Sequence, residues 1–101
     1  MFAAPPVVEA RVFAKIPDRL SKVGQRSAFA DVQFHGAETP HFIEGPSFDR
    51  QGNLFVTDIP FGRVFKITPS GDISVVVEYD GEPNGLKFHR DGRAFITDHK
   101  N

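Results

Sequence analysis

Two oxygen-bearing side chains, Glu44 and Asn84, precede similar stretches of strand-forming residues. Glu44 is followed by Gly-Pro, and Asn84 is the middle residue of a Pro-Asn-Gly tripeptide. A carboxylate and an amide oxygen are hard ligands that suit Ca²⁺, Mg²⁺ or Mn²⁺. Because calcium takes about 6–8 oxygens, two side chains would need further ligands from water or other residues. Each also has a simpler interpretation, since Pro-Asn-Gly is a common turn and a loop glutamate is usually solvated.

Other catalytic constellations find little support in the sequence. The chain has no cysteine, and its serines lie outside a G-x-S-x-G elbow, which argues against thiol and serine nucleophiles. The four histidines lack H-x-H or H-x-x-x-H spacing, which disfavours a zinc site built on them. Asp58 and Asp98 are expected to accept hydrogen bonds at strand ends rather than act as acids. Arg50, Arg63 and Arg90 are expected on solvated faces.

The shared context of Glu44 and Asn84 is part of an internal repeat. Residues 44–58 align without gaps on residues 84–98, an offset of 40 positions with seven identities in 15. The identical pairs are Gly45/Gly85, Phe48/Phe88, Arg50/Arg90, Gly52/Gly92, Phe55/Phe95, Thr57/Thr97 and Asp58/Asp98. Self-similarity at this period is typical of repeat architectures such as β-propellers. The shared register is what favours a joint role for the two side chains.

Each copy predicts two strands around a turn, and two further strands are expected between the copies. The turns at 49–52 and 89–92 end in glycine, and residues 54–57 and 94–97 are β-branched and aromatic. Residues 63–68 and 73–78 supply the third and fourth strands, joined by the Pro-Ser-Gly-Asp turn. Four antiparallel strands per period correspond to one propeller blade, although a plain β-meander would also fit. The absence of tryptophan excludes the WD40 class.

The first 41 residues carry no repeat and form the first predicted segment, with residues 42–101 as the second. Residues 10–16 are expected to form a strand and 17–23 a short helix or turn. Residues 24–41 are expected to be a loop that leads into the first strand. The predicted fold class is therefore all-β, a partial β-propeller of about one and a half blades with an N-terminal strand and loop.

Composition limits the partners. Twelve Lys and Arg residues balance 13 Asp and Glu residues, leaving a net charge of −1, so neither nucleic acid nor an anionic membrane is expected as a partner. Neither a signal peptide nor a membrane span is evident, and a cytoplasmic location is expected.

Residues 42–63 are similar to the first blade of the gluconolactonase/senescence-marker-protein (regucalcin) family, and residues 79–93 resemble the start of its second blade. The Glu-Gly-Pro and Asp-Ile-Pro elements carry most of this resemblance. It implies a six-bladed propeller that hydrolyses lactones with a divalent metal, most often calcium, with Mg, Mn and Zn as alternatives. Glu44 matches the first metal-ligand carboxylate, and Asn84 matches a channel-facing Asn that binds metal or substrate. The family's later Asn and Asp ligands, the latter its usual general base, have no counterpart here, so no catalytic residue is assigned within the chain.

Three hypotheses follow. The first is the N-terminal part of a metal-dependent lactone hydrolase, incomplete for catalysis as it stands. The second is a non-enzymatic blade module that binds a partner through an unpaired strand edge at residues 94–97. The third is self-assembly, in which three chains close a six-bladed ring.

Overall fold

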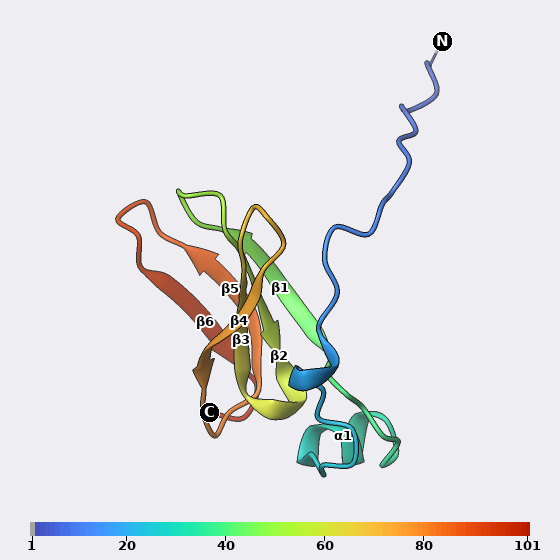
Figure 1. The fold of residues 1–101 in the computed structure, drawn as a ribbon, viewed down its shortest axis with the longest axis vertical. Helices are drawn as coiled ribbons and strands as arrows, with labels where there is room; N and C mark the ends of the chain where they lie inside the picture. Colours follow the sequence, from blue (N-terminus) through green and yellow to red (C-terminus); the bar gives the residue numbers. More distant parts are fainter. Residues whose placement is uncertain (1) are drawn as a thin grey trace.

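The computed structural model describes residues 2–101, and antiparallel strands dominate it. One sheet has the order β1-β2-β3-β4, and a separate two-stranded sheet pairs β5 with β6 (Figure 1). The strands are β1 (Ile43–Phe48), β2 (Leu54–Asp58), β3 (Arg63–Ile67), β4 (Ile73–Glu78), β5 (Pro83–Phe88) and β6 (Ala94–Asp98). The helical elements are short: η1 (Asp18–Leu20), α1 (Ala28–Gln33) and η2 (Ile59–Phe61). The prediction of an all-β fold is confirmed, and no helix among the described residues is long and apolar enough to cross a membrane.

The sequence repeat is also a structural repeat. The β5–β6 hairpin has the same strand bounds as the β1–β2 hairpin, shifted by the 40 residues of the sequence offset. Phe48 pairs with Leu54 in the first hairpin, and Phe88 pairs with Ala94 in the second. Both hairpins carry a register shift near the start of their first strand. The predicted turns form as expected, with their closing glycines at φ +83° and +95°, a conformation that glycine adopts at little cost.

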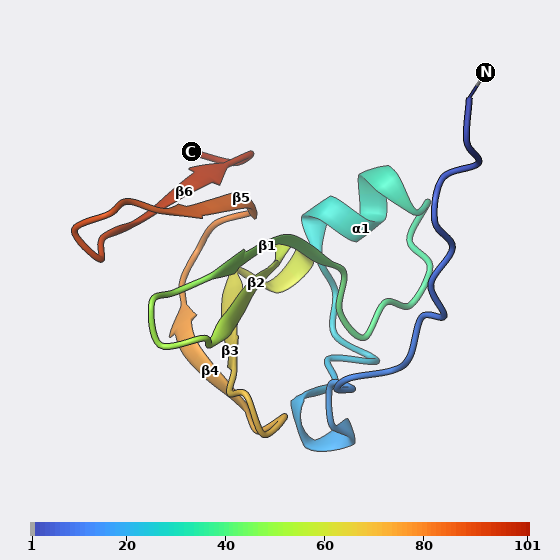
Figure 2. The ribbon, with the colours of Figure 1, turned by 90° about the horizontal axis from the view of Figure 1, so that it is seen from above.

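The four-stranded sheet is partly covered on both faces, each by a different part of the chain. Figure 2 shows the β5–β6 hairpin and the N-terminal segment on opposite sides of this sheet. On the N-terminal side, Ile16 packs into a buried cluster with apolar residues of β2, β3 and β4, and Ala14 and Leu20 lie against its margin. On the other side, the rings of Phe55 and Phe88 meet edge to face with centroids 5.0 Å apart. The sheet is therefore the middle layer of a small three-layer arrangement.

The predicted N-terminal strand at residues 10–16 is wrong, because this segment is extended but pairs with no strand. Only its end lies against the sheet, because Ile16 is buried and Ala14 partly buried there, whereas Val12 and Phe13 are exposed. The segment then turns at Pro17 into η1, which agrees with the predicted helix or turn, and the Arg19 guanidinium donates to the carbonyl of Ile73 at 3.1 Å. Side-chain packing and hydrogen bonds made by Arg19 and by the carbonyl of Leu20 hold the segment without a strand ladder.

The expected loop at residues 24–41 contains the six-residue helix α1, which the sequence analysis missed. Ser27 caps this helix, because its hydroxyl accepts from the Ala30 amide at 3.3 Å. The same hydroxyl donates to the carbonyl of Pro60 in η2 at 2.8 Å. The helix is thus held by a capping serine and by its contact with η2, neither of which gives a strong periodic signal in so short a segment.

Arg63 is not on a solvated face as predicted, since only 1% of it is exposed. Its Nε donates to Asp58 Oδ2 at 2.7 Å, and its Nη1 donates to the carbonyl of Leu20 at 2.7 Å. The guanidinium also lies over the rings of Phe61 and Phe65, 5.6 and 4.8 Å from their centroids. The strand pattern places Arg63 next to Asp58, but only the covering N-terminal segment makes this ion pair buried.

Candidate functional site

Glu44 and Asn84 line one open hollow of about 710 Å³, at the start of β1 and of β5. Each is the second residue of its strand, and both are exposed. The hollow also includes residues of β6, so it lies where the two structural repeats meet. The fold therefore brings to one place the two side chains that the sequence repeat had placed in the same register.

A close approach of the two first strands creates this proximity. Gly45 has φ +58°, and a Cβ at this position would lie 2.5 Å from the carbonyl oxygen of Asn84 and 2.9 Å from the amide nitrogen of Leu86. The buried Thr57 hydroxyl, on the strand next to β1, donates to that same Asn84 carbonyl at 2.8 Å. A glycine that leaves room and a threonine that supplies a hydrogen bond thus fix the backbone of β5 against β1 and β2.

The donor types at this hollow fit a hard divalent cation, but their number is small. The carboxylate of Glu44 and the amide of Asn84 offer oxygens of the kind that calcium prefers. Across residues 2–101, no group of three or more His, Cys, Asp or Glu side chains could hold a metal ion. The hydrogen bond that Asn84 accepts from Thr57 uses its backbone carbonyl, so its side chain is not occupied by that contact. Two side-chain ligands from this chain would leave most of a coordination shell to water or to other residues.

The repeated aspartates Asp58 and Asp98 accept backbone hydrogen bonds at equivalent places, as expected. Asp58 accepts from the Phe42 amide at 2.8 Å, and Asp98 accepts from the Glu82 amide at 3.2 Å. Burial raises the pKa of Asp58, and its hydrogen bonds from Phe42 and Arg63 oppose that shift. These contacts tie each strand end to the residue that precedes the first strand of its own hairpin. Both carboxylates are therefore structural.

Tyr79 gives Asp98 an additional partner that the first repeat lacks. Its hydroxyl donates to Asp98 Oδ2 at 2.5 Å, and this hydrogen bond holds the pKa of Asp98 well below its usual range. Partial burial, together with the neighbouring carboxylate, raises the pKa of Tyr79 to about 12. This hydrogen bond to a carboxylate joins Tyr79, which directly follows β4, to Asp98, the last residue of β6.

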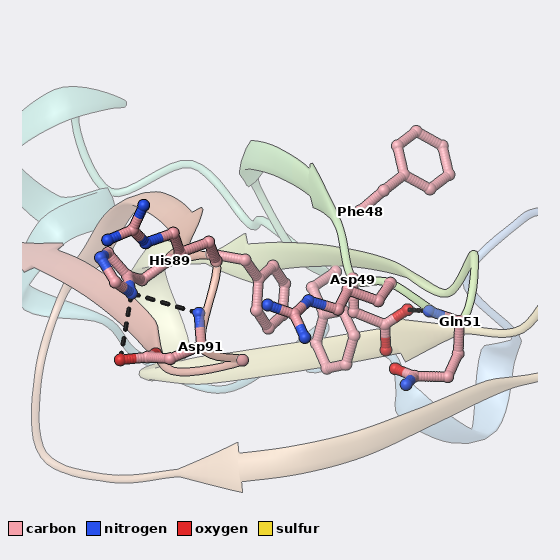
Figure 3. A pocket seen from close by; sticks show the side chains of 10 residues that line it. Phe48, Asp49, Gln51, His89 and Asp91 are labelled. Atoms are coloured by element: carbon pink, nitrogen blue, oxygen red, sulfur yellow. Dashed lines mark hydrogen bonds and ion pairs between the residues drawn. The ribbon is translucent and has the colours of Figure 1, made fainter.

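A second hollow, of about 740 Å³, lies at the other end of the strands between the two hairpin turns (Figure 3). The carboxylates of Asp49 and Asp91 interact with residues of their own turns. Asp49 Oδ1 accepts from the Gln51 amide at 2.9 Å, and Asp91 Oδ2 lies 3.0 Å from His89 Nδ1. A hydrogen bond from Asn53 lowers the pKa of Asp49, just as one from Arg93 lowers that of Asp91. The carboxylates at this hollow therefore stabilise the two turns and do not form a set of catalytic groups.

Comparison with known proteins relates the chain to lactonases. No protein-family model matches it, and no solved structure gives a significant match. Over 56 residues it is 43% identical to a protein named Lactonase drp35 from Staphylococcus aureus (strain USA300). Over 57 residues it is 37% identical to the protein of the same name from Staphylococcus epidermidis (strain ATCC 35984). Each match covers 54% of this chain but 17% of the relative, so the chain spans a small part of the proteins it resembles. This partial similarity supports a lactonase-like relationship for the chain.

Proposed function

We propose that this chain is part of a β-propeller lactone hydrolase in which Glu44 and Asn84 help to hold a divalent cation, Ca²⁺ foremost. The observation that carries the proposal is the meeting of these two side chains at one hollow in a lactonase-like chain. The 40-residue structural repeat supports the propeller, because each period supplies strands that pack face to face on the next. A small lactone is the substrate class that follows.

The chemistry assigned to this chain is binding and orientation. A bound cation would polarise the lactone carbonyl and stabilise the charge that develops on its oxygen. Glu44, exposed at the hollow, contributes a negative charge to the cation site. Asn84 contributes either its amide oxygen to the cation or its amide NH₂ to the oxygens of the substrate. We assign no general base among the described residues, because the repeated aspartates are committed to backbone hydrogen bonds.

A second function, binding of a protein partner through β6, is favoured by the exposure of apolar side chains on this strand. Phe95 is 56% exposed and Ile96 is 36% exposed, and within residues 2–101 no strand lies beside the outer edge of β6. Exposed strand edges recruit further strands or other chains. This function does not need the cation, so a cation-binding experiment separates the two.

The cation proposal is tested with Mn²⁺ as a paramagnetic probe in amide NMR spectra of the chain. We expect selective broadening of resonances from residues 44–46 and 84–86, and reversal by excess Ca²⁺. With two side-chain ligands, the dissociation constant should be weak, on the order of 1 mM.

Matched variants give the test its control. Glu44→Gln removes the charge and should abolish the selective broadening, while Glu38→Gln removes an exposed acid outside the hollow and should leave it unchanged. Broadening that survives Glu44→Gln, or that centres on the acids near Asp98, would contradict the assignment. A hydrolysis assay with a simple γ-lactone then tests the substrate class separately.

A further inference from the structure

The peptide unit between Asn84 and Gly85 is held on both sides by threonine hydroxyls. Thr57 Oγ1 donates to the Asn84 carbonyl at 2.8 Å, and the Gly85 amide donates to Thr97 Oγ1 at 2.9 Å. The two threonines lie on β2 and β6 and occupy equivalent places in the sequence repeat. Both polar groups of one peptide unit are therefore fixed by side chains from the two hairpins.

Space, and not backbone conformation, requires the glycine of this dipeptide. Gly85 is not among the glycines with positive φ, so other residue types could adopt its backbone conformation. A Cβ at this position would, however, lie 2.8 Å from Thr97 Oγ1. The hydrogen bond between Gly85 and Thr97 thus depends on having glycine directly after Asn84.

Glycine directly after asparagine makes the pair chemically labile. The Gly85 nitrogen, on losing its proton, can attack the side-chain carbonyl carbon of Asn84, because glycine has no Cβ to hinder the approach. A C–N bond forms, the side-chain nitrogen leaves as ammonia with the addition of a proton, and a cyclic succinimide results. Water then opens the ring at either carbonyl and leaves aspartate or isoaspartate.

We propose that Asn84 is a site of spontaneous deamidation and that Thr57 and Thr97 hold its rate low in the folded chain. For the Gly85 nitrogen to reach the side-chain carbon, the peptide plane must rotate about the Asn84 Cα–C bond. That rotation breaks both threonine hydrogen bonds. The Asn84 carbonyl oxygen also lies so near Gly45 that a Cβ there would be 2.5 Å from it, which leaves little room for rotation.

The residues on either side of the dipeptide add to this restraint. Pro83 is fully buried, and Leu86 is 3% exposed. With both neighbours packed, the peptide between Asn84 and Gly85 can rotate only through local opening of β5. The side-chain amide therefore persists as long as the start of β5 keeps its contacts.

Deamidation would change the ligands at the hollow that Asn84 shares with Glu44. Aspartate in place of Asn84 exchanges a neutral amide for a carboxylate, a charged ligand of the kind that calcium takes. Isoaspartate also inserts a methylene into the backbone where Thr57 and Thr97 bind. This consequence for cation binding rests on the proposed function, whereas the deamidation itself does not.

Peptide mass spectrometry of the intact chain, after incubation at mildly alkaline pH without added metal, tests the proposal. In urea, Asn84 should convert readily, and Asn53, which precedes a leucine, should convert much more slowly. In the folded chain, conversion of Asn84 should be at least about tenfold slower than in urea, because two hydrogen bonds must break before the nitrogen can attack.

Matched variants separate the two hydrogen bonds from overall stability. Thr97→Val and Thr57→Val keep the shape of the side chain and each remove one hydrogen bond, so each should speed conversion in the folded chain about fivefold. Thr39→Val is the control, because the Thr39 hydroxyl donates to the carbonyl of Ala37, away from the dipeptide. Urea titration of each variant gives the unfolded fraction and hence the conversion that unfolding alone produces.

Several results would overturn the proposal. They are an Asn84 that does not convert in urea, a folded chain that converts as fast as the unfolded one, and a Thr97→Val variant no faster than Thr39→Val. An acceleration that the unfolded fraction fully explains would overturn it as well. Because no metal is added, a failure of the cation proposal would leave all of these measurements unchanged.

Discussion

Replacement of Gly45 by alanine should destabilise the fold strongly, through two separable effects. The residue has φ +58°, a conformation that costs an alanine about 1–2 kcal/mol relative to glycine. A Cβ there would also lie 2.5 Å from the carbonyl oxygen of Asn84. Because this neighbour is backbone, it cannot rotate away as a flexible side chain would. The clash can be relieved only by moving β5 away from β1.

The size of the second effect follows from what that movement would break. It would stretch the hydrogen bond from Thr57 to Asn84, worth about 1 kcal/mol, and part the rings of Phe55 and Phe88, worth about 1 kcal/mol beyond their burial. With the backbone strain, we expect Gly45→Ala to lower the free energy of unfolding by about 3–4 kcal/mol. That is a large part of the stability of a small domain, typically about 5–15 kcal/mol.

Gly92→Ala is the matched control, because it isolates the strain. Gly92 has φ +95°, and a Cβ there would meet nothing within 4 Å. Urea unfolding followed by circular dichroism should show a loss of about 1–2 kcal/mol for Gly92→Ala and clearly more for Gly45→Ala. Equal losses would refute the reasoning, since they would mean that the close approach of β1 and β5 costs nothing to disturb.

Two further predictions concern the ionisable pairs. Tyr79 is the one tyrosine of the chain, so absorbance at alkaline pH reports its ionisation directly; its midpoint should lie at about 12 in the folded protein, near 10 in urea, and lower in Asp98→Asn than in the parent. Because the folded state holds this proton more tightly, the stability gained from Tyr79 should be present below pH 10 and lost as pH rises towards 12, and a folded midpoint near 10 would contradict this. Arg63→Ala should lower the free energy of unfolding by about 3–5 kcal/mol in urea titrations, because it leaves the buried carboxylate of Asp58 without its cation. A loss below about 1 kcal/mol would show instead that the pair is solvated.

Local patterns in the sequence were enough to predict the hairpins. The turns at Asp49–Gly52 and His89–Gly92 form with the hydrogen bonds expected of them, and the strands that follow begin where β-branched and aromatic residues begin. These features depend on the types of neighbouring residues and on the positions of the glycines, both of which can be read from the sequence. The same local reasoning failed at residues 10–16, where the burial of Ile16 against the sheet, and not strand pairing, holds the end of the segment.

The 40-residue repeat, the all-β class and the equal register of Glu44 and Asn84 can all be derived from the order of the residues. That Glu44 and Asn84 line one hollow depends on the folded chain, because Gly45 must leave room for the backbone of β5 beside β1. The burial of Arg63 likewise depends on the folded chain, since the N-terminal segment that covers it is distant in the sequence and no local pattern shows where that segment packs. Turns and repeats depend on the types of residues close together in the sequence. The burial of Arg63 and the approach of β5 to β1 depend instead on which distant segments pack against each other.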